Sequence, residues 1–460
     1  MPAELETPLS PLTPPLAQES RVLWPERTHA RLQCGIPVWL VERHTIPKFS
    51  MQFFVRSGAA MEFPSNRGVA ALTSALLRTG TCTSDERAID DELRRIGADL
   101  GAGAGADASW IVASGLSEFS AELAGLLADL TRNPLFPVPQ FERERRNSLE
   151  AVRLSRSSPA FLANERFRSV LFGEHPYAVV APTEAQVEAI TRQLILDFYR
   201  MHYSPANTFL LAVGDFSPPR LVEQLERAFE GWVGGEVEQP EETPLPSHFG
   251  RHVALVHTPG AVQTQIALGN IAVTREHPDW LRLTLANAIY GGAFHSRLVA
   301  NIREQKGYTY SPRSGLTALR RHGFFSVHAA VRNEVVAATL AEIFYELDRI
   351  RALTVRQDEL ADAQAYLSGV FSLGIATLDG LAGQLATLYL YELPEDYLET
   401  YRERIRALTL DDVLAAARAH LDSANAQIIL AGDADQIEAQ ARLFGDVQVF
   451  DAQGKLLSSD

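Results

Sequence analysis

Cysteine, clusters of basic residues and long apolar runs are scarce in this chain of 460 residues, and each scarcity excludes a class of protein. The two cysteines, Cys34 and Cys82, are too few for a disulfide framework and form no C-x-x-C pair. A net charge of -15 without a Lys/Arg block disfavours nucleic acid as a partner, because binding to phosphates requires a basic face. No run of about 18 apolar residues occurs, so the sequence predicts no membrane span.

The amino-terminal segment, residues 1–20, is rich in proline and acid and contains neither a basic region nor a continuous apolar stretch. This composition predicts a flexible, polyproline-like arm and not a secretory signal. Together with the few cysteines, it favours a cytoplasmic location and leaves the periplasm open.

The remaining chain has the composition of a globular protein with a large interior, since 46% of all residues are hydrophobic and 22% are charged. Its length exceeds that of one typical core and predicts two domains. An internal repeat supports this division, because residues 190–215 align without a gap on residues 408–433. The matching pairs are Thr191/Thr409, Arg200/Arg418, His202/His420, Ala206/Ala424, Asn207/Asn425, Gly214/Gly432 and Asp215/Asp433.

Each copy of the repeat is typical of a helix that starts after a threonine cap, a turn at asparagine and a buried strand that ends in Gly-Asp. The sequence therefore predicts a duplicated domain, with copies at residues 21–233 and 251–460 joined by an acidic, Pro/Gly-rich linker at residues 234–250. Strands and helices follow one another without regular βαβ alternation, which indicates an α+β fold. The Gly/Ala-rich stretch that begins at Gly97 is predicted to be flexible and to lead into a strand around residues 110–113. We expect two homologous domains, each a mostly antiparallel sheet with helices packed on one side.

One stretch of the second copy, residues 286–311, combines a glycine pair, a helical pattern and two candidate binding residues. Gly291 and Gly292 permit a tight turn or a close approach of another backbone, and Gly307 is typical of a helix C-cap. Arg303 is then expected in the last helical turn and Tyr310 on a following strand, so that both side chains could converge on one point. A guanidinium and a phenol donate hydrogen bonds to a carbonyl or carboxylate, but a helix-end arginine and a core-packed tyrosine remain an alternative.

The helical segment over residues 68–81 resembles the metal-binding helix of the inverse zincins, the pitrilysin-type peptidases of family M16. Their motif is G-x-A-H-x-x-E-H-x-x-x-x-G-T, and the four framework positions, Gly68, Ala70, Gly80 and Thr81, match it. The positions of the two zinc-binding histidines and the general base hold Ala71, Ser74 and Ala75 instead. The resemblance places the third ligand, a distal glutamate, near Ala151, beside Glu150. Because alanine offers no lone pair to zinc, we expect no metal in this chain.

The resemblance extends over nearly the whole chain after the arm, through NPLF, GEHPY and the S-R-L...R-E-x-x-G-x-x-Y pattern that includes Arg303 and Tyr310. In the family this arginine and tyrosine bind a backbone carbonyl of the peptide substrate. The resemblance therefore implies a non-catalytic subunit of a heterodimeric, M16B-type zinc metallopeptidase. Arg303 and Tyr310 would contact the substrate, this chain would form half of the peptide-binding chamber, and the zinc would belong to the partner subunit. Alone, the chain would be inactive.

Other interpretations remain open at this point. A purely structural or assembly protein, similar to the core subunits of the cytochrome bc1 complex, would share the fold without any role in proteolysis. A substrate receptor similar to the α-subunit of the mitochondrial processing peptidase is disfavoured, because GGAFHSRL stands where that protein has a long glycine-rich loop. His202 and His420 are interpreted as structural caps at helix ends, and His248 and His252 as structural or solvent-exposed residues, and none of the four as a metal ligand.

Overall fold

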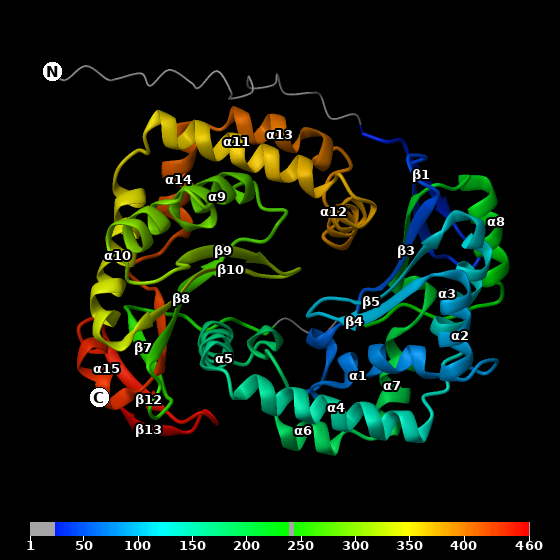
Figure 1. The fold of residues 1–460 in the computed structure, drawn as a ribbon, viewed down its shortest axis with the longest axis horizontal. Helices are drawn as coiled ribbons and strands as arrows, with labels where there is room; N and C mark the ends of the chain where they lie inside the picture. The colour runs from blue at the N-terminus through cyan, green and yellow to red at the C-terminus, as the bar shows by residue number, and fades with distance from the viewer. Residues whose placement is uncertain (1–23, 239–242, 460) are drawn as a thin grey trace.

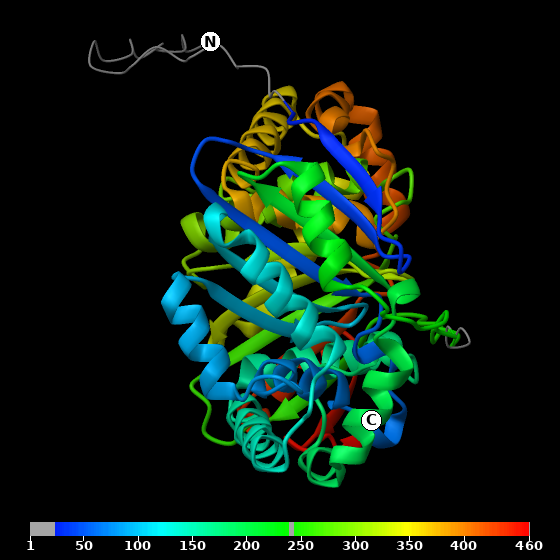
Figure 2. The ribbon, with the colours of Figure 1, turned by 90° about the vertical axis from the view of Figure 1, so that its right-hand side faces the viewer.

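The computed structural model describes residues 24–238 and 243–459, which form two halves that face each other (Figure 1). The predicted arm lies outside the described residues, as does part of the predicted linker, residues 239–242. Each half contains one sheet. In Figure 2, where the first half faces the viewer, its helices lie in front of its strands, on the side away from the second half.

The first sheet has six strands in the order β1-β2-β6-β3-β5-β4, and all its neighbouring pairs are antiparallel except β2 and β6. Its long strand β3 is almost entirely buried because helices cover both of its faces. The strands are β1 (Arg27–Arg31), β2 (Pro37–Glu42), β3 (Lys48–Val55), β4 (Asp99–Ala104), β5 (Ser109–Leu116) and β6 (Thr208–Gly214).

The second sheet has seven strands in the order β13-β12-β7-β11-β8-β10-β9. Its parallel pairs are β12 with β7 and β7 with β11, and the others are antiparallel. The strands are β7 (His252–His257), β8 (Gln263–Ala272), β9 (Arg313–Ala318), β10 (Gly323–Arg332), β11 (Gln427–Gly432), β12 (Asp446–Phe450) and β13 (Leu456–Ser459).

The two sheets repeat one topology, because β2-β6-β3-β5-β4 corresponds in order and direction to β7-β11-β8-β10-β9. The sequence repeat occupies equivalent places: α7 (Arg192–His202) precedes β6, and α14 (Leu410–His420) precedes β11. Thr191 and Thr409 cap these helices, each side chain accepting a backbone N–H three residues on. The predicted fold, two homologous α+β units with mostly antiparallel sheets, is confirmed.

Each half buries one face of its sheet under its own helices. In the first half these are α1 (Val69–Leu76), α2 (Glu86–Ile96), α3 (Ser120–Arg132), α4 (Val138–Arg156), α7 and α8 (Pro218–Ala228). In the second half they are α9 (Trp280–Asn287), α10 (Val336–Ala352), α11 (Gln357–Gly374), α14 and α15 (Ala434–Ala441). The short helix α6 (Glu184–Ala189) packs beside α4, and α13 (Tyr397–Ala407) packs beside α11.

The opposite face of each sheet is covered by a helix from the other half. Helix α5 (Pro159–Phe172) places Phe167 and Leu171 in one buried cluster with Ile429 of β11. Helix α12 (Leu378–Leu390) likewise packs Leu385 with Leu211 of β6. Both helices lie between the two sheets in Figure 1. The helices of each half thus cover one side of their own sheet, as predicted, and this exchange closes the other side.

Two local predictions were wrong. The Gly/Ala stretch after Gly97, predicted to be flexible, contains the edge strand β4, and a Cβ at Gly103 would lie only 2.8 Å from the Trp110 ring of β5. Glycine there makes room for the indole across the strands. Tyr310, predicted on a strand, precedes β9, whose first residue, Arg313, follows a proline that has no N–H for a ladder.

Limited proteolysis is expected to cut first within residues 234–250, since most of the described residues there are exposed and none belongs to a helix or strand. The two fragments are then expected to elute together in size-exclusion chromatography, because α5 and α12 each pack on the sheet of the other half. A first cut within residues 190–215 would contradict the predicted domain boundary.

In the described part of the chain, no single helix is long and apolar enough to cross a membrane. The pair formed by α11 and α12 passes that test only jointly, by length and composition, and is bent by 110°.

Candidate functional site

Helix α1 carries the residues that the sequence aligned with a metal-binding helix, and a buried carboxylate holds its first turn. Gly68 precedes the helix with a φ of 97°, a conformation that favours glycine. Glu62 accepts hydrogen bonds from the backbone N–H groups of Gly68 at 3.0 Å and Ala70 at 2.8 Å. Burial raises the pKa of Glu62 to about 7. These contacts satisfy N–H groups that no earlier turn can pair.

The four positions expected to hold the metal-site residues present no ligand. Ala71 and Ala151 are exposed, Ala75 is partly buried, and Ser74 is fully buried. The Oγ of Ser74 lies 3.3 Å from the Oη of Tyr203, within the core. Helix α1 packs against α4, which carries Ala151, but alanine methyl groups have no lone pairs to offer a metal. These residues do not fit a zinc ion.

Glu150 is the carboxylate next to the position of the third ligand, and it is already in an ion pair. Its Oε1 lies 2.8 Å from Nη1 of Arg153, which also contacts Glu184 at 2.8 Å. Among the described residues, two groups could hold a metal by geometry, and both lie in the second half. They are His277, Asp279 and His420, and His257, Asp433 and Asp435.

Existing contacts explain the first of these groups. Nε2 of His420 lies 2.9 Å from Oδ2 of Asp279, whose other oxygen accepts from Arg282 at 2.7 Å. Nδ1 of His277 accepts the backbone N–H of Asp279, so in the neutral ring the proton sits on Nε2, the nitrogen that a metal would need. The repeat partner of His420, His202, is buried, and burial lowers its pKa to about 4. Both repeated histidines therefore have structural surroundings, although His420 pairs with a side chain and does not cap its helix.

Purified protein is expected to retain no stoichiometric zinc after dialysis and to hydrolyse no peptide alone, because the ligand positions hold Ala71, Ser74, Ala75 and Ala151. Elemental analysis measures the metal. A His277→Asn variant serves as a control, because it removes one residue of the group formed by His277, Asp279 and His420. One tightly held zinc ion per chain in both proteins would contradict the prediction.

The second candidate site lies on the π-helical segment Val299–Gln305. Gly307, with a φ of 63°, follows two residues after the segment ends. Arg303 stacks on the ring of Tyr310, with 4.5 Å between its Cζ and the ring centroid. It also lies over Phe294, 5.2 Å from that centroid. The structure thus brings the two predicted residues together and adds Phe294, which the sequence analysis missed. The sequence signal that could have indicated this residue was an aromatic side chain just after the glycine pair.

Arg303 and Tyr310 lie in the connection of the second half that corresponds to the connection carrying α1 in the first half. The segment from α9 to Gln305 connects β8 to β9, just as α1 and α2 connect β3 to β4. The glycine pair makes room chiefly for side chains and not for another backbone, since a Cβ at Gly291 would lie 2.6 Å from Oγ of Ser314 and one at Gly292 would lie 2.5 Å from Nδ2 of Asn287.

Comparison with protein families agrees with this geometry. The family model described as insulinase, peptidase family M16, matches residues 38–178. The family model described as the peptidase M16 inactive domain matches residues 189–367, and the two matches together cover more than half of the chain. The chain belongs to peptidase family M16.

Individual proteins and solved structures resemble the chain over most of its length. A protein of Streptomyces coelicolor, named an uncharacterized zinc protease, is 26% identical over 370 residues, which is 78% of this chain and 80% of the relative. The crystal structure of a peptidase M16 inactive domain from Pseudomonas fluorescens is 28% identical, with a TM-score of 0.80 over 88% of this chain and 98% of the other. A protease from Helicobacter pylori, at 20% identity, shares the fold with a TM-score of 0.83 over 89% and 100%.

Proposed function

We propose that this M16 chain is the non-catalytic subunit of a heterodimeric zinc metallopeptidase. It supplies Arg303 and Tyr310 as contacts to a backbone carbonyl of the peptide substrate and forms half of the peptide-binding chamber. A zinc-bearing M16 subunit, in which the H-x-x-E-H helix is intact, performs the hydrolysis. The composition supports a cytoplasmic location for the pair.

The exposure of Tyr310 and the unused hydrogen-bond donors of Arg303 are the observations that support this proposal. Tyr310 is 79% exposed, so it is not packed in the core. In the described part of the chain, the polar contact of Arg303 is Nε with Glu304 at 3.2 Å, which leaves both terminal nitrogens available. A helix-end arginine with a structural role would bond the last carbonyls of its helix. Here two rings hold the guanidinium in place and its donors stay free for a carbonyl.

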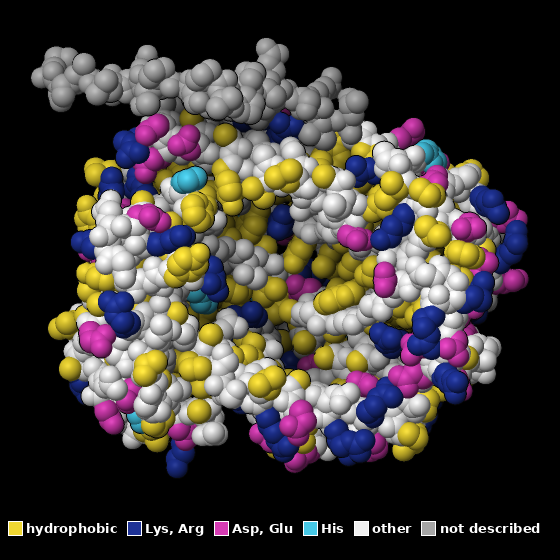
Figure 3. All heavy atoms as spheres, viewed as in Figure 1, with side chains coloured by type: hydrophobic (Ala, Val, Ile, Leu, Met, Phe, Trp, Pro, Cys, Tyr) yellow, Lys and Arg dark blue, Asp and Glu magenta, His cyan; other side chains and the backbone are white. Residues whose placement is uncertain are grey.

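The shape of the molecule supports the chamber. The face shown in Figure 3 is hollowed between the two halves, and hydrophobic side chains gather inside the hollow. A concave surface with apolar walls suits an extended peptide, because pockets bury ligands mainly against apolar side chains. A second subunit of the same fold placed over this face would enclose the peptide.

Reconstitution with a chain that carries an intact H-x-x-E-H helix tests the proposal. We expect the mixture to cleave a quenched peptide and each chain alone to be inactive or nearly so, with a complex visible in size-exclusion chromatography. A complex whose zinc-bearing chain is equally active without this subunit would contradict the proposal and favour a structural or assembly role.

A further inference from the structure

A second cleft, distinct from Arg303 and Tyr310, opens on the helical side of the second half. It has a volume of about 810 Å³ and lies between the π-helical segments Ala288–Gly292 and Val299–Gln305 and the helices α10 and α11. This volume is in the range that encloses a ligand of drug size or a peptide of a few residues. Small side chains, among them Ala300, Ala341 and Ala363, leave the space open, and the tyrosines Tyr345 and Tyr366 are exposed beside it.

The cleft is lined by equal numbers of positively and negatively charged side chains. Four cations, Arg297, Lys306, Arg349 and Arg356, face four carboxylates, Glu342, Glu346, Glu359 and Asp362. A site for a phosphate or another simple anion would carry an excess of positive charge. A balanced lining instead suits a ligand that bears one charge of each sign.

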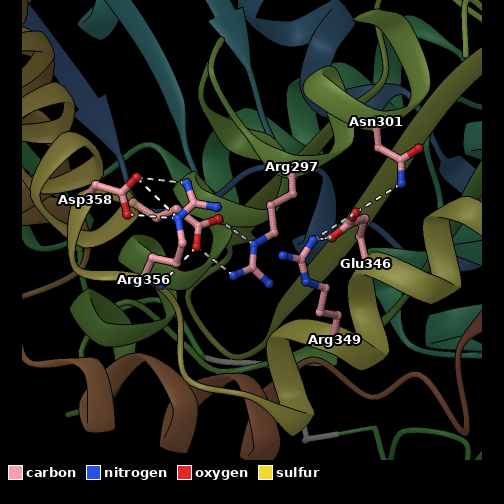
Figure 4. A network of polar contacts seen from close by, with 7 residues as sticks. Arg297, Asn301, Glu346, Arg349, Arg356 and Asp358 are labelled. Atoms are coloured by element: carbon pink, nitrogen blue, oxygen red, sulfur yellow. Dashed lines mark hydrogen bonds and ion pairs between the residues drawn. The ribbon is translucent and has the colours of Figure 1, made fainter. Parts of the chain in front are cut away.

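Arg297 provides the donor side of the cleft. The side chain is only 7% exposed and makes a two-point ion pair with Glu359, through Nε at 2.8 Å and Nη2 at 3.0 Å. Its third nitrogen, Nη1, is buried and has no hydrogen-bond partner in the described part of the chain. Figure 4 shows Arg297 and Arg349 pointing toward one another from different elements. A carboxylate that entered here would supply the acceptor that Nη1 lacks.

The acceptor side lies one helical turn further along, at Asn301. Its Nδ2 donates to Glu342 at 2.9 Å and to the buried Glu346 at 3.0 Å, and Figure 4 shows the second of these contacts. Its Oδ1 is buried and has no hydrogen-bond partner among the described residues. Glu342 is otherwise paired with Lys306 at 3.2 Å, on the rim. Glu346 also pairs with Arg349, 3.3 Å away. An ammonium group has three donors and no acceptor, so it would supply Oδ1 of Asn301 with a donor beside these two carboxylates.

We propose that this cleft binds a short peptide in its zwitterionic form, with the terminal carboxylate at Arg297 and Arg349 and the terminal ammonium at Asn301, Glu342 and Glu346. A cleft of about 810 Å³ has room for an extended peptide of two or three residues, which spans about 7 to 11 Å. The exposed rings of Tyr345 and Tyr366 then contact its side chains. This inference does not depend on the proposed function, because Arg303 and Tyr310 do not line the cleft.

Calorimetric titration of the full chain with the tripeptide Ala-Phe-Ala tests the site. We expect saturable binding, weakened at least tenfold when the amino terminus is acetylated or the carboxyl terminus is amidated. Absence of binding at millimolar peptide, or equal binding of the doubly blocked peptide, would overturn the proposal. So would preferential binding of the acetylated, purely anionic form, since it would indicate an anion site.

Two variants assign the ends of the peptide. Glu342→Gln is expected to weaken Ala-Phe-Ala several-fold but to leave the acetylated peptide unaffected. Arg349→Gln is expected to weaken binding of the peptide with a free carboxyl terminus several-fold but to leave binding of the amidated peptide unaffected. Both side chains are only partly buried, and Glu334→Gln, at an exposed position outside the cleft, is the matched control. Equal losses for free and blocked peptides in folded variants would refute the assignment.

Discussion

Replacing Arg303 with alanine is expected to lower the peptidase activity of the reconstituted pair about tenfold or more without affecting its assembly. A hydrogen bond from a charged donor contributes about 1.5 to 3 kcal/mol, against about 0.5 to 1.5 kcal/mol for a neutral one. Tyr310→Phe removes a neutral donor but keeps the ring on which the guanidinium stacks at 4.5 Å, so a loss of only a few-fold is expected.

The measurement compares turnover of a quenched peptide per complex, with complex formation followed by size-exclusion chromatography. Arg332→Ala provides a control, because Arg332 is an exposed arginine of the same half and its ion pair with Glu334 is long, at 3.9 Å. Full activity of an assembled Arg303→Ala complex would remove the main reason to assign this chain a role in substrate binding. Loss of assembly with normal activity per complex would indicate a structural role.

Acidification is expected to destabilise the fold by about 5 kcal/mol between pH 7 and pH 4.5. Burial lowers the pKa of His175, His202 and His328 to about 4, with nearby cations adding to the effect at His175 and His328. An unperturbed histidine has a pKa of about 6.5, so below that pH the unfolded chain binds more protons than the folded one. The stability contributed by the neutral rings is present above pH 6.5 and is lost as the pH falls toward 4.

Glu62 opposes this trend. Its pKa of about 7 means that the folded chain holds a proton there which the unfolded chain releases above about pH 4.5. Its effect therefore favours the fold as the pH falls from 7 to 4.5, by about 2 to 3 kcal/mol against about 7 kcal/mol lost through three histidines. The histidines prevail because they are more numerous.

Urea unfolding followed by circular dichroism at both pH values measures the effect. His202→Phe keeps a ring of similar shape in the buried site and is expected to remove about a third of the histidine contribution, while Glu62→Gln is expected to steepen the pH dependence. Equal unfolding midpoints at pH 7 and pH 4.5 for the unaltered chain would contradict this account.

Sequence patterns correctly predicted those helices and strands that are specified by residues close to one another in the chain. The threonine caps of α7 and α14, the Gly307 helix end and the repeat all depend on residues within one helix and its next strand, and the duplicated topology followed from them. Strand β4 was missed because glycine and alanine disfavour strands, and only the packing of Trp110 across β5 explains them.

The candidate site also has features that local sequence predicts and features that depend on contacts between distant residues. The absence of ligands at Ala71 and Ala75 could be predicted because the framework glycines fix the register of α1. The stacking of Phe294 on Arg303 and the contact of His420 with Asp279 could not, because folding brings these residues together across a loop or across 141 positions.

The exchange of α5 and α12 also constrains how the chain is synthesised. The inner face of the first sheet, with Phe209 and Leu211, is complete once β6 has left the ribosome, but its cover begins only at Leu378. At about 5 to 20 residues per second, roughly 170 further residues require about 10 to 30 s. During that time an apolar sheet surface faces the cytosol or a chaperone, so this nascent chain is expected to be most prone to aggregation before translation reaches α12.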